Sequence, residues 1–131
     1  TRALSLVGKK MPENRRDDMC TKNELNSILQ KLTQIDRSVY GENLVQVILY
    51  GSYARGDYHT DSDVDVVAIV HGDRKTLQQQ LKKVWDFSCE LELEYDTILS
   101  PTVIPYEEFK QYQTILPYYR NISQEGVVIS A

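Results

Sequence analysis

Cysteines and long apolar runs are scarce in this 131-residue chain. The two cysteines, Cys20 and Cys89, are too few for a disulfide framework and lack the spacing of metal ligands, so we expect free thiols. No apolar run approaches the roughly 20 residues of a membrane helix, and the first residues do not resemble a secretory signal. We therefore expect a cytoplasmic protein, and the length is typical of one domain with one core.

Positive charge is also in short supply, because 15 Lys and Arg residues face 19 Asp and Glu residues and leave a formal net charge of −4. A protein that grips a long nucleic acid backbone does so through many Lys and Arg contacts to phosphates. This balance therefore argues against extended nucleic acid as a partner, and the lack of apolar runs argues against a membrane.

The first part of the chain shows no sustained periodicity, so we expect residues 1–20 to be a flexible tail that precedes a domain at 21–131. A basic cluster in this tail is expected to be a solvated charge run rather than a binding site. Met11 and Met19 are both candidate native start residues, in which case the residues before them come from cloning. The basic cluster consists of Lys9, Lys10, Arg15 and Arg16.

Apolar periodicity predicts one α/β (α+β) domain, with a small mixed sheet covered by helices. Thr21 and Glu24 form a capping box for the first helix, and Trp85 is expected in the core. We expect Thr102 to Ile104, which lie between two prolines, to form an edge strand or an extended loop. We expect residues 127–129 to be an apolar tail that packs against the domain. The expected helices span 22–39, 74–87, 106–113 and 117–125, and the expected strands span 44–50, 63–70 and 91–99.

The chemistry is concentrated where the strand at 44–50 ends in Gly51-Ser52 and, ten residues later, Asp63-x-Asp65 opens the next strand. Alternate side chains of a strand share a face, so Asp63 and Asp65 point the same way, roughly 7 Å apart along the backbone. Two such carboxylates repel each other unless a cation lies between them. Mg²⁺ is commonly held by one or two carboxylates together with substrate phosphates, and a pair of ions activates the attacking oxygen and stabilises the leaving one.

Gly51 and Ser52 supply the other half of the expected site. Glycine allows a phosphate to approach the backbone closely, and a helix or turn that starts at Ser52 would aim N–H groups at an anion. Arg55 adds positive charge near a triphosphate or holds the loop. The pattern therefore predicts a phosphate cradle that faces a metal-binding pair of carboxylates.

A third carboxylate often completes such a site. Glu90, Glu92, Glu94 and Asp96 alternate along the expected strand at 91–99, so all four can share one face. We select Asp96 as the third ligand and as the group that accepts the acceptor's proton, with Glu94 as the alternative.

The motif Gly51-Ser52, ten residues, Asp63-x-Asp65 resembles the signature of the DNA polymerase β-like nucleotidyltransferase superfamily. With Ala54-Arg55-Gly56 and Ser62 added, and with the stretch 116–126, the chain is similar to the minimal nucleotidyltransferases, or MNTs. The resemblance implies a polymerase β-like palm in which Gly51 and Ser52 hold the triphosphate.

It also implies that Asp63, Asp65 and Asp96 bind two Mg²⁺ ions, and that AMP is transferred from ATP or another nucleoside triphosphate to a hydroxyl. Minimal nucleotidyltransferases often occur beside a HEPN-type partner, and some are antitoxins that transfer AMP to a tyrosine of that toxin. The resemblance therefore implies a HEPN-like protein partner.

Several alternatives remain open at this stage. A calcium loop counted from Asp61 would need Gly and Glu where Val66 and Gly72 stand. A sugar transferase with an Asp-x-Asp motif would not explain Gly51-Ser52, and an ordinary surface turn with solvating aspartates is the simplest alternative. Among functions, a non-catalytic or weakly catalytic module that neutralises a HEPN-like partner by contact competes with the enzyme, as does a transferase that acts on a small molecule.

Overall fold

The computed structural model describes residues 22–59 and 62–130. The expected N-terminal tail, with its basic cluster, Cys20 and the capping residue Thr21, lies outside the described residues. The helices are α1 (Lys22–Tyr40), α2 (Ser52–Arg55), α3 (Arg74–Tyr95), α4 (Tyr106–Tyr112) and α5 (Pro117–Glu125), with a 3-10 turn, η2, at Gly41–Asn43. The strands are β1 (Leu44–Tyr50), β2 (Val64–Val70), β3 (Leu99–Pro105) and β4 (Val127–Ser130).

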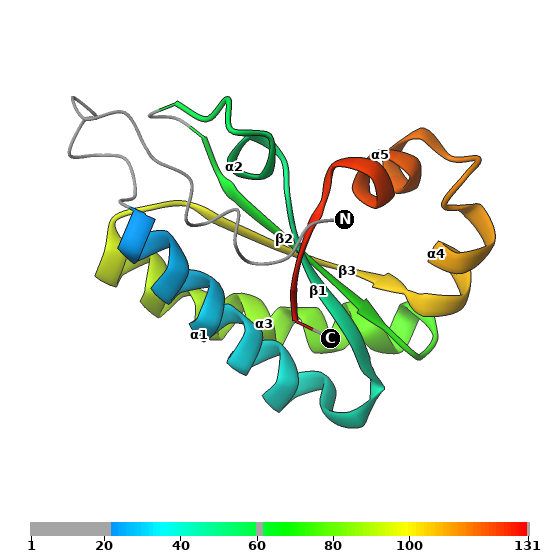
Figure 1. Cartoon of the computed structure of the whole chain (residues 1–131). Coiled ribbons are helices and arrows are strands. Elements are labelled where there is room, and N and C mark those ends of the chain that lie inside the picture. The colour runs from blue at the N-terminus through cyan, green and yellow to red at the C-terminus, as the bar shows by residue number, and fades with distance from the viewer. Residues whose placement is uncertain (1–21, 60–61, 131) are drawn as a thin grey trace.

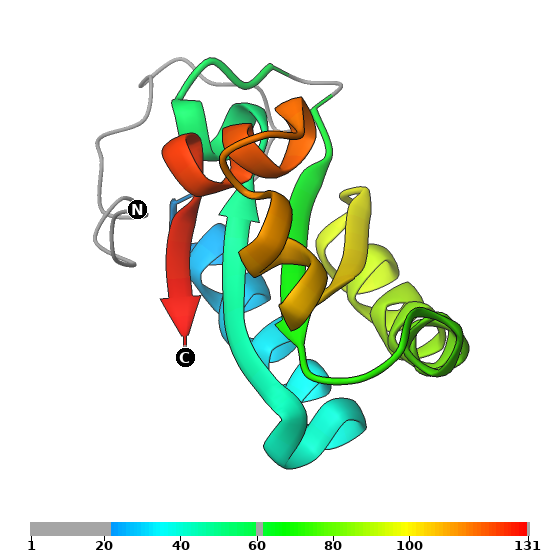
Figure 2. The ribbon, with the colours of Figure 1, turned by 90° about the vertical axis from the view of Figure 1, so that its right-hand side faces the viewer.

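The four strands form one mixed sheet in the order β3-β2-β1-β4. β1 is antiparallel to both β2 and β4, whereas β2 and β3 are parallel and are joined by the crossover helix α3. Figures 1 and 2 show α1 and α3 side by side on one face of the sheet and α4 and α5 on the other. The expected fold class, a small mixed sheet covered by helices, is confirmed.

α1 is amphipathic and lays a stripe of buried side chains against the sheet and α3. The stripe repeats every three or four residues, which is the period of a helix face. It includes one acidic residue, Asp36, only 4% exposed. The buried residues of α1 are Leu25, Ile28, Leu29, Leu32, Thr33, Asp36 and Tyr40.

The opposite face of the sheet carries its own apolar cluster, because alternate residues of a strand point to opposite sides. Val64 and Val66 of β2 pack toward α1, while Val67 and Ile69 pack toward α4 and α5. The cluster on the α4 and α5 side consists of Ile48, Val67, Ile69, Ile104, Phe109, Tyr119 and Ile122. Both faces are thus covered over most of their length, and the ends of the strands are left for polar groups.

The expected strand at 91–99 is wrong. α3 continues to Tyr95, ends at Asp96 in a left-handed conformation, and β3 begins only at Leu99. The alternating Leu and Glu residues are strong helix formers, and the buried spacing of α3 continues through Ser88 and Leu91. The segment expected as an edge strand or extended loop is thus the middle of β3, and the expected apolar tail at 127–129 is strand β4.

The prediction that Trp85 lies in the core is also wrong, since 46% of its surface is exposed. It follows Val84, which lies on the buried stripe of α3, and is therefore turned about 100° away from it. The indole N–H still has a partner, because it donates to the Pro101 carbonyl of β3 at 3.0 Å.

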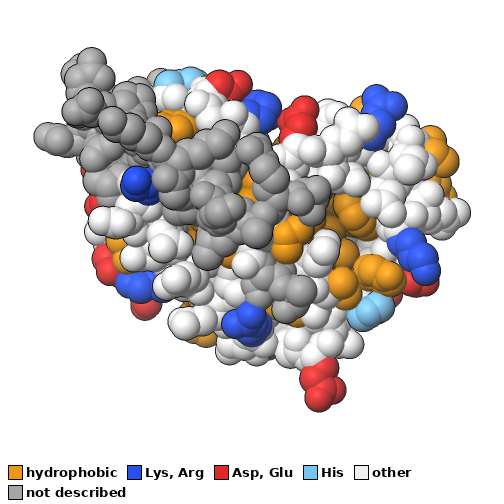
Figure 3. Space-filling view, in the orientation of Figure 1, with side chains coloured by type: hydrophobic (Ala, Val, Ile, Leu, Met, Phe, Trp, Pro, Cys, Tyr) orange, Lys and Arg blue, Asp and Glu red, His pale blue; other side chains and the backbone are white. Residues whose placement is uncertain are grey.

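Charges are mixed on the surface of the domain. On the face drawn in Figure 3, the visible basic side chains are interspersed with acidic ones. None of the helices in the described part of the chain is both long enough and apolar enough to cross a membrane.

Candidate active site

Gly51 joins the end of β1 to the short helix α2 and has a backbone conformation that disfavours other residues, with φ of 76°. A Cβ atom at this position would also collide with the Asp65 carboxylate. The Gly51 carbonyl accepts hydrogen bonds from the N–H groups of Ala54 and Arg55 at 3.0 Å, which turns the chain sharply. The glycine thus brings the turn before Ser52 directly against one of the two motif aspartates.

Asp63 directly precedes β2, Asp65 is its second residue, and both are partly buried. Burial raises the pKa of the Asp65 carboxyl, the negative charge of Asp63 raises it further, and the positive charge of Arg55 lowers it. The interaction shows that the two aspartates are close enough to repel each other. The structure therefore gathers Gly51, Arg55, Asp63 and Asp65 at one end of the sheet.

One row of residues crosses three strands at this end of the sheet. Tyr50 of β1 is paired with Asp65 of β2, which is paired with Ser100 of β3. The Ser100 hydroxyl donates to the Asp63 carboxylate at 3.0 Å. Sequence reasoning missed Ser100 because it placed the third strand too early; a strand that begins at Leu99 would have put Ser100 beside the motif.

Asp96 and Glu94 do not lie on a strand face. Asp96 is exposed in the turn that ends α3, four residues before Ser100, and Glu94 is exposed on the helix, paired with Lys31 at 3.1 Å. The argument that placed Asp96 beside Asp65 on a neighbouring strand is thus corrected, since Ser100 occupies that place. Within 22–59 and 62–130, no three His, Cys, Asp or Glu residues gather as a metal-binding group.

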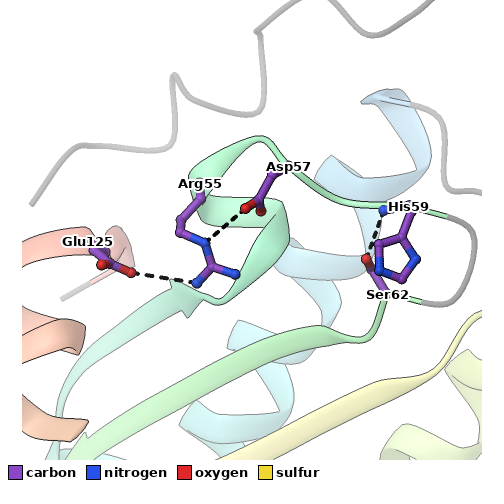
Figure 4. Close-up of polar contacts among 5 residues, drawn as sticks. All are labelled: Arg55, Asp57, His59, Ser62 and Glu125. Carbon is purple, nitrogen blue, oxygen red and sulfur yellow. Dashed lines mark hydrogen bonds and ion pairs between the residues drawn. The ribbon is translucent and has the colours of Figure 1, made fainter. Parts of the chain in front are cut away.

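Arg55 is held between two carboxylates (Figure 4). Its Nε donates to Asp57 at 3.3 Å, and one of its terminal nitrogens lies 3.5 Å from Glu125, the last residue of α5. All three side chains are substantially exposed, so each ion pair contributes little to stability. The contacts nevertheless aim the guanidinium across the space between α2 and α5.

The loop that leads to Asp63 is closed by two hydrogen bonds, also visible in part in Figure 4. The N–H of His59 donates to the Ser62 hydroxyl at 2.8 Å, and the N–H of Ser62 donates to the His59 carbonyl at 2.9 Å. Tyr53 of α2 and Tyr58 stack in parallel, with ring centroids 4.7 Å apart. These contacts tie Ser62, which precedes Asp63, to His59 and hold Tyr58 against α2.

Comparison with known proteins decides the family. Residues 17–129 match the model of the nucleotidyltransferase domain family. The chain belongs to this family. It is a nucleotidyltransferase, and the resemblance to the minimal nucleotidyltransferases is confirmed.

Two relatives from Methanocaldococcus jannaschii carry an inferred assignment as protein adenylyltransferases. One is 35% identical over 80 residues, which cover 61% of this chain and 79% of the relative. The other is 30% identical over 93 residues, which cover 71% of this chain and 85% of the relative.

Solved structures show the same fold at lower identity. A protein of Sulfolobus solfataricus, inferred to be a nucleotidyltransferase, has a TM-score of 0.53 and 18% identity, with 90% of each chain covered. A chain from a toxin–antitoxin structure with AMP-PNP has a TM-score of 0.50 and 18% identity, with 76% of this chain and 70% of that chain covered. At 18% identity, these likenesses show the fold alone.

Proposed function

We propose that this nucleotidyltransferase transfers AMP from ATP to a hydroxyl group carried by a partner protein, in a reaction that depends on Mg²⁺. The observation that carries the proposal is the contact between Gly51 and Asp65, which sets a phosphate-binding turn directly against a pair of aspartates. The choice of AMP and of a protein acceptor is supported by relatives inferred to be protein adenylyltransferases and by a structural neighbour with AMP-PNP.

Asp63 and Asp65 are the residues that would hold Mg²⁺, and the donor set suits that ion. Burial and the charge of Asp63 both raise the pKa of Asp65, so a cation relieves a repulsion that the fold imposes. Because two carboxylates are all that the described part of the chain gathers here, the remaining ligands would come from substrate phosphates and water, as is usual for Mg²⁺. When bound, Mg²⁺ would neutralise phosphate charge in the transition state.

The turn at Gly51 and Ser52 binds and orients the triphosphate, and Arg55 adds positive charge beside it. The acceptor oxygen attacks the α-phosphorus, and a new phosphorus–oxygen bond forms. The bond between the α-phosphorus and the bridging oxygen breaks, and pyrophosphate leaves with the electron pair, while the acceptor's proton passes to solvent. Such transfers depend mainly on in-line positioning and charge stabilisation, and we assign the positioning to Gly51 and Ser52 and the positive charge to Arg55.

The partner we propose is a HEPN-like protein in the cytoplasm. The structural neighbour from a toxin–antitoxin structure supports a protein partner, and the net charge of −4 argues against a long nucleic acid as acceptor.

The test is transfer of label from [α-³²P]ATP in the presence of Mg²⁺, with and without the product of the neighbouring gene. Asp63→Asn and Asp65→Asn should each abolish incorporation and leave the circular dichroism spectrum unchanged. Asp57→Asn is the matched control, because it removes a carboxylate of the same loop that pairs with Arg55 instead. Full activity in the Asp63→Asn, Asp65→Asn double variant would refute the proposal.

A second function is favoured by one observation, the presence of Ser100 where the sequence predicted a carboxylate. A chain with a reduced set of acidic ligands would suit a protein that neutralises its partner by contact. Tight complex formation without incorporation of label would support this second function.

A further inference from the structure

Tyr118, the second residue of α5, is a large aromatic side chain that remains 46% exposed. Its ring packs edge-on against Tyr50, with ring centroids 5.9 Å apart and an interplanar angle of 82°. Tyr50 is the last residue of β1, directly before Gly51, and is paired with Asp65 across the sheet. Tyr118 therefore contacts the residue that connects the phosphate-binding turn with Asp65.

Tyr118 and Asp65 also lie on the same face of the sheet. Asp65 and Val67 are two residues apart on β2, so their side chains share a face, and Val67 packs toward α4 and α5. Tyr50 packs against the same apolar cluster. Burial raises the pKa of the Tyr118 hydroxyl, and the negative charge of Asp65 raises it further, as expected for neighbouring groups.

α5 is anchored by residues other than Tyr118. The adjacent Tyr119 is buried and donates its hydroxyl to Glu108 of α4. Arg74, at the start of α3, pairs with Glu108 and donates to the Tyr119 hydroxyl at 3.2 Å. At its other end, the last residue of α5 pairs with Arg55 of α2, and Figures 1 and 2 show α2 and α5 at the same end of the sheet. The exposed ring of Tyr118 is thus held in place before any ligand binds, which lowers the cost of binding.

Other aromatic rings are directed away from the face that carries Asp65. Tyr53 and Tyr58 stack on each other and belong to the cluster that packs against α1. Trp85 is on α3, which covers the opposite face of the sheet. Tyr118 thus combines an exposed aromatic surface with a place beside the aspartates.

We infer that Tyr118 binds the nucleobase of the nucleoside triphosphate by stacking, an inference that rests on the function proposed above. The nucleoside is attached to the α-phosphate, so it extends from the place where Gly51 and the aspartates hold the phosphates. Stacking on an aromatic ring depends on the flat face of the base and not on its hydrogen-bonding edge. Tyr118 therefore favours a nucleotide over an inorganic polyphosphate, and by itself does not select among the bases.

The test is isothermal titration calorimetry of the full chain, in Mg²⁺, with two ligands: AMP-PNP and inorganic tripolyphosphate, which has no nucleoside. Tyr118→Ala should weaken the binding of AMP-PNP by about tenfold or more, and should leave the Kd of tripolyphosphate within about twofold of the wild type. Tyr118→Phe keeps the ring and should bind AMP-PNP within about twofold of the wild type. GMP-PNP should lose affinity for Tyr118→Ala by about the same factor as AMP-PNP, because both bases present a flat face.

Phe87→Ala is the matched control. It removes an aromatic ring that is 52% exposed, but from α3 on the opposite face of the sheet. This variant should bind AMP-PNP and tripolyphosphate like the wild type.

Tripolyphosphate separates stacking from a structural role of Tyr118. If the alanine substitution merely displaced α5, the contact between α5 and Arg55 would be disturbed, and the binding of tripolyphosphate would weaken together with that of AMP-PNP. Equal losses for the two ligands would therefore overturn the inference. A loss confined to AMP-PNP, with GMP-PNP unaffected, would overturn stacking as the mode of binding.

Unchanged binding of AMP-PNP by a folded Tyr118→Ala variant would also overturn the inference, and would leave contact with a partner protein as the use of the exposed ring. This outcome would not affect the proposed function, which depends on the aspartates. Binding of neither ligand by the wild type would overturn the proposed function and, with it, the inference.

Discussion

Asp36 and Asp65 are both acidic residues whose pKa is raised by burial, yet they lie in different surroundings. Asp36 is on the buried stripe of α1, where burial raises the pKa of its carboxyl to about 7. Asp65 is only half-buried, and its pKa also responds to Asp63 and Arg55. The comparison teaches that a raised carboxyl pKa by itself indicates only burial. A carboxyl that also has a second carboxylate and a cation as neighbours indicates a site for charged ligands.

The largest expected effect separates the two residues by activity. Asp65→Asn should lower AMP transfer by roughly 1,000-fold or more, because it removes one of the two metal-binding carboxylates. Asp36→Asn should leave the rate within about twofold, because Asp36 lies in the helical layer on the other side of the sheet. The measurement is label transfer from [α-³²P]ATP at saturating Mg²⁺. Equal losses in the two variants would show that the comparison is mistaken.

The second effect is on stability and its pH dependence. The folded-state pKa of Asp36, about 7, is above the usual value of 3.8, so the folded state holds this proton more tightly than the unfolded chain. Its contribution is complete below about pH 4 and is lost as the pH rises to about 7. Three pKa units correspond to at most about 4 kcal/mol, so Asp36→Asn should raise the free energy of unfolding at pH 8 by up to that amount.

Urea denaturation at pH 5 and pH 8 measures this effect. The gain in Asp36→Asn should be larger at pH 8 than at pH 5, because the wild-type carboxyl is mostly protonated at pH 5. A gain that is equal at both pH values would exclude titration of Asp36 as its cause.

The third effect concerns the turn that distinguishes the surroundings of Asp65. Gly51→Ala should weaken binding of Mg²⁺ and AMP-PNP and lower the free energy of unfolding by about 2 to 3 kcal/mol, because the methyl group strains φ and collides with Asp65. Gly41→Ala is the control, since Gly41 also has positive φ, 61°, but nothing lies within 4 Å of an added Cβ. It should lower the free energy of unfolding by about 1 kcal/mol only. Isothermal titration calorimetry and urea denaturation supply the two readouts.

Physical reasons explain which of these features were visible in the sequence. The segment from β1 to β2 was predicted well because two short apolar strands flank glycine, serine and spaced aspartates, and few structures satisfy that pattern. The alternating acids before Asp96 fit a strand face and a helix surface equally, so the boundary of α3 depended on packing through Leu91. The close approach of Gly51 and Asp65 could therefore be predicted from the sequence, whereas the place of Ser100 beside Asp65 required the strand register.

The buried stripe of α1 shows the same limit. Ile35 and Val39 are apolar and continue the helical spacing of the first helix, yet both are only partly buried. Asp36 and Tyr40 are buried in line with Leu25, Leu29 and Leu32 instead. Acidic residues are rarely expected at core positions, so the burial of Asp36 could not be predicted from the sequence. The rotation of α1 against α3 is decided by tertiary contacts.

The smallest expected effect comes from removing a single charge near Arg55, the cation that acts on Asp65. Glu125→Gln removes one of the two carboxylates that hold Arg55, at 3.5 Å, and leaves Asp57 in place. The pair is exposed, so the free energy of unfolding should change by less than about 1 kcal/mol. The loss of one competing negative charge should tighten the binding of AMP-PNP by up to about threefold at low salt, and less at high salt because ions screen exposed charges. Weaker binding of AMP-PNP by Glu125→Gln would instead mean that Glu125 positions Arg55 for the triphosphate. In that case Asp57→Asn, which leaves the contact between Arg55 and Glu125 intact, would bind AMP-PNP like the wild type.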